Sequence, residues 1–135
     1  LVSYQDWPEF QQIIGGKYKK PKYKGDTIDL SDFKHDIILK IDCTPDHPIT
    51  KDIESFEIFD EGYMNIEIIP TVMPLLTTKH EFCDEITGWV HRVKKSRIVY
   101  LMPGHARPAF ENEAYKKIIR NAIFWAAKRT IEEEQ

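Results

Sequence analysis

The sequence lacks any apolar run that approaches the roughly 18 residues of a membrane-spanning helix. It also lacks a charged segment followed by an apolar one, which is the pattern of a secretory signal peptide. These absences exclude a transmembrane helix in the printed sequence. We therefore expect a soluble protein with no membrane partner.

Excess charge and cysteine are both scarce. The 19 basic and 22 acidic residues leave a net charge of -3, which gives no overall attraction to nucleic acid. The one basic cluster, Lys17 to Lys24, is interpreted as a solvated loop. Cys43 and Cys83 have no metal-type spacing and no strand-to-helix elbow around them, so we interpret both as ordinary thiols and not as nucleophiles.

Apolar residues, by contrast, are present in the amount that a globular core needs. A chain of 135 residues that is 41% apolar and 12% aromatic can form one domain with a real core. The sequence has no internal repeat and no low-complexity segment. One domain is therefore the expected organisation.

The stretch from Arg97 to Ala127 organises the rest of the chain. Ile98 to Met102 is an unbroken apolar run of strand length, which predicts a central strand covered on both faces. Pro103-Gly104 ends this strand and His105 follows at once. Open α/β sheets bind ligands at the carboxyl ends of their strands, so His105 is the first candidate for a site residue.

A helix is predicted directly after this loop. Asn112 can cap it, with Glu111 and Glu113 near the positive helix end and Lys128 and Arg129 near the negative end. One apolar stripe at helical spacing contains Tyr115, Ile118, Ile119, Ala122 and Trp125 or Ala126. The strand, the loop and the amphipathic helix together form one β-loop-α unit.

Shorter elements are predicted elsewhere. A helix begins at Trp7-Pro8 and ends at Gly15-Gly16, with Trp7 in the core. Strands are predicted at residues 35–42, 56–60, 72–78 and 88–93, the third with an edge position or a bulge at Pro74 and the last in a hairpin with the 98–102 strand. Residues 60–63 are predicted to turn, residues 17–32, 42–50 and 79–85 to form loops, and residues 130–135 to be an acidic tail.

Two loops offer side chains that could join His105. His47 lies among turn formers, and Asp60 and Glu61 follow a predicted strand together with Tyr63. If the loops meet above one sheet edge, His47, Glu61 and His105 suit a divalent metal such as zinc, or a polar rim for sugar hydroxyls.

Each of these residues also has a purely structural interpretation. Asp60 and Glu61 can be simple turn residues, His47 can cap Ile49 or Thr50, and His105 can hydrogen-bond its own loop. His91 shares a strand face with Trp89, and such a histidine is more often packed than reactive.

Seven short motifs occur in a fixed order along the chain. They are W-P-E-F-x-x-I-I-G-G-x-Y at 7–18, H-P-I-T at 47–50, F-x-x-x-D-E-x-Y at 56–63, W-V-H-R at 89–92, G-H at 104–105, A-F-E-N at 109–112 and R-N-A-I-x-W-A-A at 120–127. Each is weak alone, but in this order and spacing they make the sequence resemble the ThuA-like, or trehalose utilisation, family. The resemblance covers nearly the whole chain.

The resemblance implies a flavodoxin-like three-layer α/β/α sandwich related to the class I glutamine amidotransferases. In that fold several strands and helices precede the helix that resembles residues 7–14, so residues 1–135 are expected to be the later part of a single ThuA-like domain. The nucleophilic cysteine of the related amidotransferases stands on the turn before that helix, which here would lie upstream of Leu1.

The resemblance also places His105 where the amidotransferases keep their catalytic histidine. Those enzymes follow it with Pro-Glu, whose glutamate orients the ring, whereas Ala106 and Arg107 follow here, so we expect no glutaminase activity. The predicted catalytic residues are His105, Glu61 and Asp60. The predicted substrate-binding residues are His47, Tyr63, His91, Gly104 and Asn112.

The function that the resemblance implies is the utilisation of trehalose or a related sugar. A sugar or sugar derivative would bind in a cleft at the carboxyl ends of the strands, and no cofactor is indicated beyond a divalent metal such as zinc. The alternative is a non-catalytic domain that binds a sugar or another protein on an amidotransferase-like fold. A small-molecule sugar is the expected partner, nucleic acid and membrane are not, and a homo-oligomer is compatible with the sequence.

Overall fold

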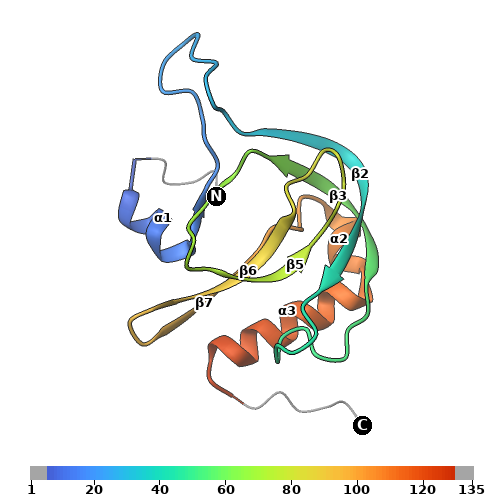
Figure 1. Ribbon diagram of the computed structural model, residues 1–135. Coiled ribbons are helices and arrows are strands. Elements are labelled where there is room, and N and C mark those ends of the chain that lie inside the picture. The colour runs from blue at the N-terminus through green and yellow to red at the C-terminus, as the bar shows by residue number, and fades with distance from the viewer. Residues whose placement is uncertain (1–5, 130–135) are drawn as a thin grey trace.

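The computed structural model describes residues 6–129 (Figure 1). Its helices are α1 (Pro8–Ile14), α2 (Arg107–Glu111) and α3 (Glu113–Ala126). Its strands are β1 (Gly16–Lys17), β2 (Asp32–Cys43), β3 (Phe56–Met64), β4 (Glu67–Ile68), β5 (Met73–Thr77), β6 (Ile86–Val93) and β7 (Ser96–Leu101). The predicted acidic tail lies outside the described residues.

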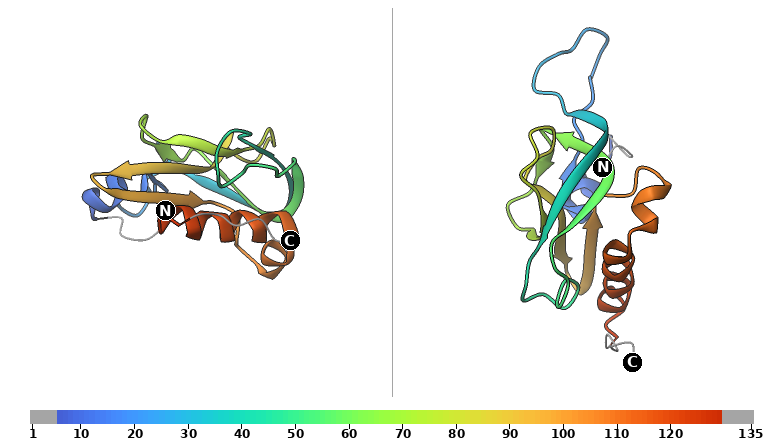
Figure 2. Two further views of the ribbon diagram at one scale, coloured as in Figure 1. Left: turned by 90° about the horizontal axis from the view of Figure 1, so that it is seen from below. Right: turned by 90° about the vertical axis from the view of Figure 1, so that its right-hand side faces the viewer.

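Five strands form one antiparallel sheet in the order β3-β2-β5-β6-β7, and β1 pairs separately with β4. The sheet is curled, and its long strands β2 and β3 bend around one side of the molecule (Figure 1). Helix α3 lies along one face of the sheet, with α2 on the same side (Figure 2). The architecture is therefore a mixed α/β fold with a curled antiparallel sheet.

The alternation predicted for residues 35–42 is confirmed in β2. Leu39 and Ile41 are fully buried, whereas Ile38, directly before them, is 58% exposed and lies opposite Phe59 of β3. Successive side chains of a strand point to opposite faces, so one face of β2 contributes to the core and the other meets solvent. The core continues into β3, β5 and α3 through Ile58, Leu75, Leu76, Ile118 and Ala122.

Of the edge position or bulge predicted at Pro74, the structure has the bulge, and the predicted hairpin is also present. In β5 the pairing with β6 shifts register between Pro74 and Leu76, which lets a residue without an N–H sit inside a sheet. Strands β6 and β7 pair from Gly88 opposite Leu101 to Val93 opposite Ser96.

The prediction of a central strand at residues 98–102 was wrong about its position. Strand β7 lies at the edge of the five-stranded sheet, since within residues 6–129 it pairs with β6 and with no other strand. The apolar residues of β7 are explained by their contacts with the core and with β6, not by a central position in the sheet. Val99 and Leu101 pack on the core, while Tyr100 stacks on Trp89, with 4.2 Å between the ring centroids.

Helix α3 has the predicted cap and apolar stripe. The Asn112 side chain accepts a hydrogen bond of 3.0 Å from the Tyr115 N–H, which satisfies a donor that the first helical turn leaves free. The buried positions of the helix are Tyr115, Ile118, Asn121, Ala122 and Trp125. The stripe therefore holds α3 against the sheet.

Helix α1 ends as predicted, but its tryptophan does not lie in the core. Gly15 adopts the left-handed conformation at φ 90°, and the Trp89 indole N–H donates to the Ile14 carbonyl at 2.8 Å. Trp7 is 46% exposed and stacks on Phe10. A helix of seven residues with no buried side chain has no inner face on which Trp7 could be covered.

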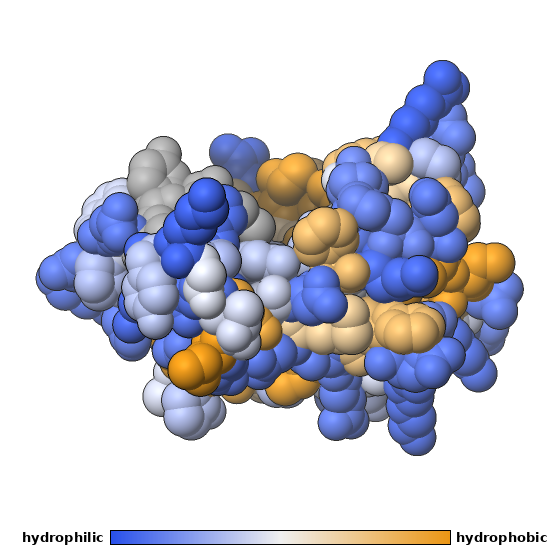
Figure 3. Space-filling view, turned by 90° about the horizontal axis from the view of Figure 1, so that it is seen from above, coloured by the Kyte–Doolittle hydropathy of each residue, from blue (hydrophilic) through white to orange (hydrophobic). Residues whose placement is uncertain are grey.

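Hydrophilic residues cover most of the face seen in Figure 3, with hydrophobic ones showing between them. The predicted loop at residues 17–32 is largely exposed, and its Lys19 pairs with Asp29 at 2.7 Å.

None of the helices in the described part of the chain has the length and apolar character needed to cross a membrane.

Two glycine substitutions test how α1 is attached. Gly15 and Gly25 both have positive φ, but a Cβ on Gly15 would lie 2.6 Å from Trp89 Nε1, whereas a Cβ on Gly25 would meet nothing within 4 Å. We expect Gly25→Ala to lower the free energy of unfolding by about 1 kcal/mol or less, the cost of the backbone conformation. Gly15→Ala should cost about 1–3 kcal/mol more, because the added methyl group is overpacked. Urea unfolding of both variants measures the difference, and equal losses would contradict the contact.

Candidate functional site

A β-bulge in β2 places a histidine beside the first carboxylates of the predicted site. Lys34 pairs with Gly62 and Ile37 with Asp60, so two residues of β2 lie opposite Glu61 alone. The extra residue is accommodated by Asp36, whose φ is 56°. Bulges of this kind redirect side chains and are frequent beside functional sites.

The prediction that residues 60–63 form a turn was wrong. Asp60 and Glu61 lie inside β3, which continues to Met64 because β2 pairs with it on both sides of the bulge. Both carboxylates are almost completely buried, with 3% and 4% of their surfaces exposed. Buried charges need partners, so the contacts of these two side chains are informative.

Asp60 holds the loop that follows β7. Its two carboxylate oxygens accept hydrogen bonds from the backbone N–H groups of Gly104 at 2.6 Å and His105 at 3.0 Å. The Tyr115 hydroxyl of α3 donates to the Pro103 carbonyl of the same loop at 2.5 Å. The loop is thereby attached both to the sheet and to the helix. These bonds fix the position of the His105 backbone.

Glu61 lies between two imidazole rings. Its Oε2 atom is 2.7 Å from His105 Nδ1 and 2.9 Å from His35 Nδ1. The centroids of the two imidazole rings are 4.8 Å apart. Neither contact has the alignment of a hydrogen bond, so this oxygen has no hydrogen-bond partner among the described residues. The Glu61 side chain is 5% exposed, whereas those of His35 and His105 are 50% and 45% exposed. The rings therefore form the solvent side of the cluster.

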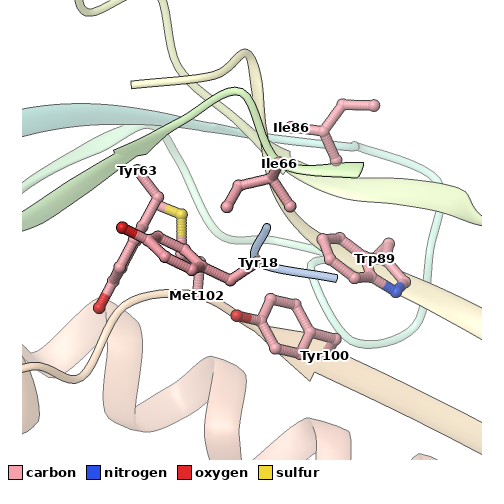
Figure 4. A pocket seen from close by; sticks show the side chains of 7 residues that line it. All are labelled: Tyr18, Tyr63, Ile66, Ile86, Trp89, Tyr100 and Met102. Atoms are coloured by element: carbon pink, nitrogen blue, oxygen red, sulfur yellow. The ribbon is translucent and has the colours of Figure 1, made fainter. Parts of the chain in front are cut away.

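An aromatic cavity lies beside Tyr63, which also interacts with Glu61 (Figure 4 shows the cavity). It has a volume of about 60 Å³ and is lined by Tyr18, Tyr63, Ile66, Ile86, Trp89, Tyr100 and Met102. The hydroxyl groups of Tyr18 and Tyr63 lie at one end, and the Trp89 indole nitrogen points away at the other (Figure 4).

Tyr63 connects the cavity to the carboxylate. Burial raises the pKa of the Tyr63 phenol, and the neighbouring Glu61 carboxylate raises it further through its charge and a hydrogen bond. The pKa of Tyr18 is raised by burial and then by the charges of Asp32 and Glu61. Both phenols stay protonated at neutral pH and can donate hydrogen bonds to a ligand.

Among the sequence-predicted site residues, Asp60, Glu61, Tyr63, Gly104 and His105 come together at this place. The structure does not bring His47 to the cluster. His47 is buried, its Nδ1 accepts a hydrogen bond from the Ile49 N–H at 3.2 Å, and its ring packs against Trp125. The structural alternative considered for His47, a cap on Ile49, is what the structure shows.

The two remaining predicted residues, His91 and Asn112, make structural contacts outside the cluster. His91 is half-buried in β6 and pairs with Ile98 of β7. Asn112 caps α3 and donates through its amide to the Glu57 carbonyl at 2.8 Å. His35 occupies the position expected of His47, although nothing in its immediate sequence marks it as a site residue.

Fold and site together define an α/β protein that keeps a buried carboxylate between two histidines, next to an aromatic cavity. The chain belongs to the ThuA (trehalose utilisation) family, whose sequence model matches residues 2–126. This confirms the family resemblance carried by the seven motifs. No protein of curated function matches the sequence.

One solved structure has a similar fold, the crystal structure of a ThuA-like protein from Parabacteroides merdae. The TM-score is 0.71 at 17% sequence identity, and the match covers 96% of this chain. It covers 58% of the other protein, so this chain spans little more than half the length of that relative. A likeness at this identity shows the fold alone.

The pH dependence of stability tests the place of His47. Burial lowers the pKa of its imidazole, and the positive charge of Arg97 lowers it further. The folded state thus favours neutral His47, a contribution that is complete above the unfolded pKa of about 6.5 and is lost as the pH falls through the lower folded pKa. In His47→Asn, whose side-chain oxygen can still accept from Ile49, we expect a smaller loss of unfolding free energy between pH 7 and pH 5. Urea titrations at both pH values measure it, and equal losses in both proteins would contradict it.

Thiol reactivity tests the interpretation of the two cysteines. Burial raises the pKa of Cys43 and of Cys83 to about 11, with a further contribution from Asp42 at Cys43. The shift from 9.0 to about 11 leaves about a hundredfold less thiolate at neutral pH. We expect both thiols to react slowly with Ellman's reagent in the folded protein and rapidly in urea. A thiol that reacts in the folded state as fast as free cysteine would be a candidate nucleophile after all.

Proposed function

We propose that the protein takes part in the utilisation of trehalose or a related sugar by binding a sugar derivative in the aromatic cavity and changing it at the Glu61–His105 cluster. The observation that carries this proposal is the position of Tyr63. This side chain lines the cavity and interacts with Glu61, so the apolar surface and the charged cluster belong to one site.

The cavity has the composition that a sugar needs. Sugars present apolar C–H faces between their hydroxyl groups, and the aromatic rings that line the cavity offer apolar surfaces for such a face. The phenols of Tyr18 and Tyr63 offer hydrogen bonds to hydroxyls. A volume of about 60 Å³ is several times the 10–15 Å³ that one water needs, so the cavity accommodates part of a sugar and not a complete disaccharide.

The cluster can supply the chemistry. The residues after His105 lack the carboxylate that amidotransferases use to orient their histidine, but Glu61 places a carboxylate oxygen 2.7 Å from His105 Nδ1. An imidazole beside a buried carboxylate is suited to proton transfer at a sugar oxygen or at a carbon next to a carbonyl group. No step requires a thiol, and we expect no glutamine hydrolysis.

The same proposal places the chain within a larger unit. We infer that residues 1–135 are the later part of a flavodoxin-like, amidotransferase-like domain, in which other elements complete the sheet. What supports a larger unit is that the relative from Parabacteroides merdae is longer, since the match covers 58% of it; the flavodoxin-like arrangement is what the family resemblance implies.

Binding and turnover are tested by calorimetry and product analysis with trehalose, other disaccharides and forms in which one hydroxyl is oxidised to a ketone. Tyr63→Phe should weaken binding by about 1–2 kcal/mol, because the ligand or Glu61 loses a hydrogen-bond partner. The matched control is Tyr23→Phe, since Tyr23 is 66% exposed and lies outside the cavity. His105→Ala should abolish turnover and leave the thermal unfolding transition in place.

The outcomes separate the candidate functions. Binding that depends on Tyr63 without turnover of any compound would favour a non-catalytic sugar-binding domain. Equal affinities of the wild type, Tyr63→Phe and Tyr23→Phe would remove the cavity from the site.

A further inference from the structure

We propose that His35, Glu61 and His105 bind one divalent metal ion, with zinc as the preferred ion. The ligand atoms are the Nδ1 atoms of the two histidines and Glu61 Oε2. The three residues each offer a ligand atom, and these atoms all lie within 4.8 Å of one another. This metal site shares Glu61 and His105 with the proposed sugar site, but it can be tested without any sugar.

The donor set suits zinc. Two histidines and one glutamate are a known catalytic zinc ligand set, in which a fourth position stays open. Bonds of about 2.1 Å in a tetrahedral site put the ligand atoms about 3.4 Å apart. The separations of 2.7 and 2.9 Å from Oε2 to the two Nδ1 atoms are shorter, whereas the whole set spans up to 4.8 Å, so the rings need to shift by about an ångström to reach this geometry. Their half-exposed positions permit this movement.

The buried oxygen of Glu61 also favours a cation. Glu61 Oε2 accepts no aligned hydrogen bond, and the Glu61 side chain is only 5% exposed. Its neighbours at 2.7 and 2.9 Å are imidazole nitrogens, which compensate a buried carboxylate only when the rings are protonated, so neutral rings leave its charge uncompensated. A metal ion between this oxygen and the two imidazoles would compensate that charge.

The backbone holds the three ligands in place before any metal binds. Glu61 stands in a strand, His35 is presented by the bulge at Asp36, and the loop of His105 is fixed by the hydrogen bonds to Asp60. Such supporting contacts orient the ligands of metal sites and contribute to their affinity. Asp60 is thus a positioning residue for the proposed site and not a ligand.

The ion would keep at least one position for an external oxygen. The imidazoles of His35 and His105 are 50% and 45% exposed, so they leave the side opposite Glu61 open to solvent. Water or a substrate hydroxyl can occupy that position, where a divalent ion polarises the oxygen.

The test is a titration of the intact chain with zinc, and with cobalt(II) as a spectroscopic probe, after removal of metals by chelation and in the absence of any sugar. We expect one ion per chain, a higher Tm in the presence of zinc, and a cobalt spectrum without thiolate bands. His35→Ala, Glu61→Gln and His105→Ala should each weaken zinc binding at least tenfold. His91→Ala is the matched control, a half-buried strand histidine outside the cluster, and should bind as the wild type does.

A measurement on the unmodified protein keeps the test independent of how well the variants fold. In ¹⁵N spectra of the histidine side chains, zinc should shift the Nδ1 resonances of two of the five histidines. No saturable binding up to millimolar zinc, or binding that His35→Ala, Glu61→Gln and His105→Ala leave unchanged, would overturn the proposal. Because no sugar is present, failure here leaves the sugar-binding test standing, and failure of that test leaves this one standing.

Discussion

The site depends on two hydrogen bonds that Asp60 accepts from the backbone of Gly104 and His105. They join residues 44 and 45 positions apart in the sequence, at the end of β7 and in the middle of β3. Without them the loop after β7 would lose its attachment to β3 and keep the contact of Tyr115 with Pro103. His105 would then lose its defined place beside Glu61, and with it the chemistry that the cluster offers.

Glu61 shows that the cluster is not arranged for stability alone. A buried carboxylate whose oxygen accepts no aligned hydrogen bond costs desolvation free energy that an apolar residue at this position would not. Local violations of this kind are expected at functional sites, where the residues are retained for what they bind or do. The neighbouring Tyr63 and the cavity give that charged group a surface against which a ligand can lie.

Features that depend on local sequence patterns could be predicted. The alternation that buries Leu39 and Ile41, the Asn112 cap and the stripe of α3 each arise from residues close together in the chain. The pairing of Glu61 with His105 was also predictable in outline, because both were assigned to strand ends, although Glu61 lies inside its strand. Trp7 was assigned wrongly, since a pattern shows which residues are apolar but not whether a surface exists to cover them.

The sequence by itself determined the family, the amphipathic elements and the choice of His105 as a candidate site residue, because these depend on patterns within short stretches of the chain. Only the tertiary structure decided which histidine joins it. The bulge at Asp36 turns His35 toward Glu61, whereas His47 is drawn into the core by Trp125 and Ile49. It also decided that β7 is an edge strand, since pairing partners are chosen among segments far apart in the chain. Strand register and long-range packing are properties of the whole fold, so no short stretch of sequence could reveal them.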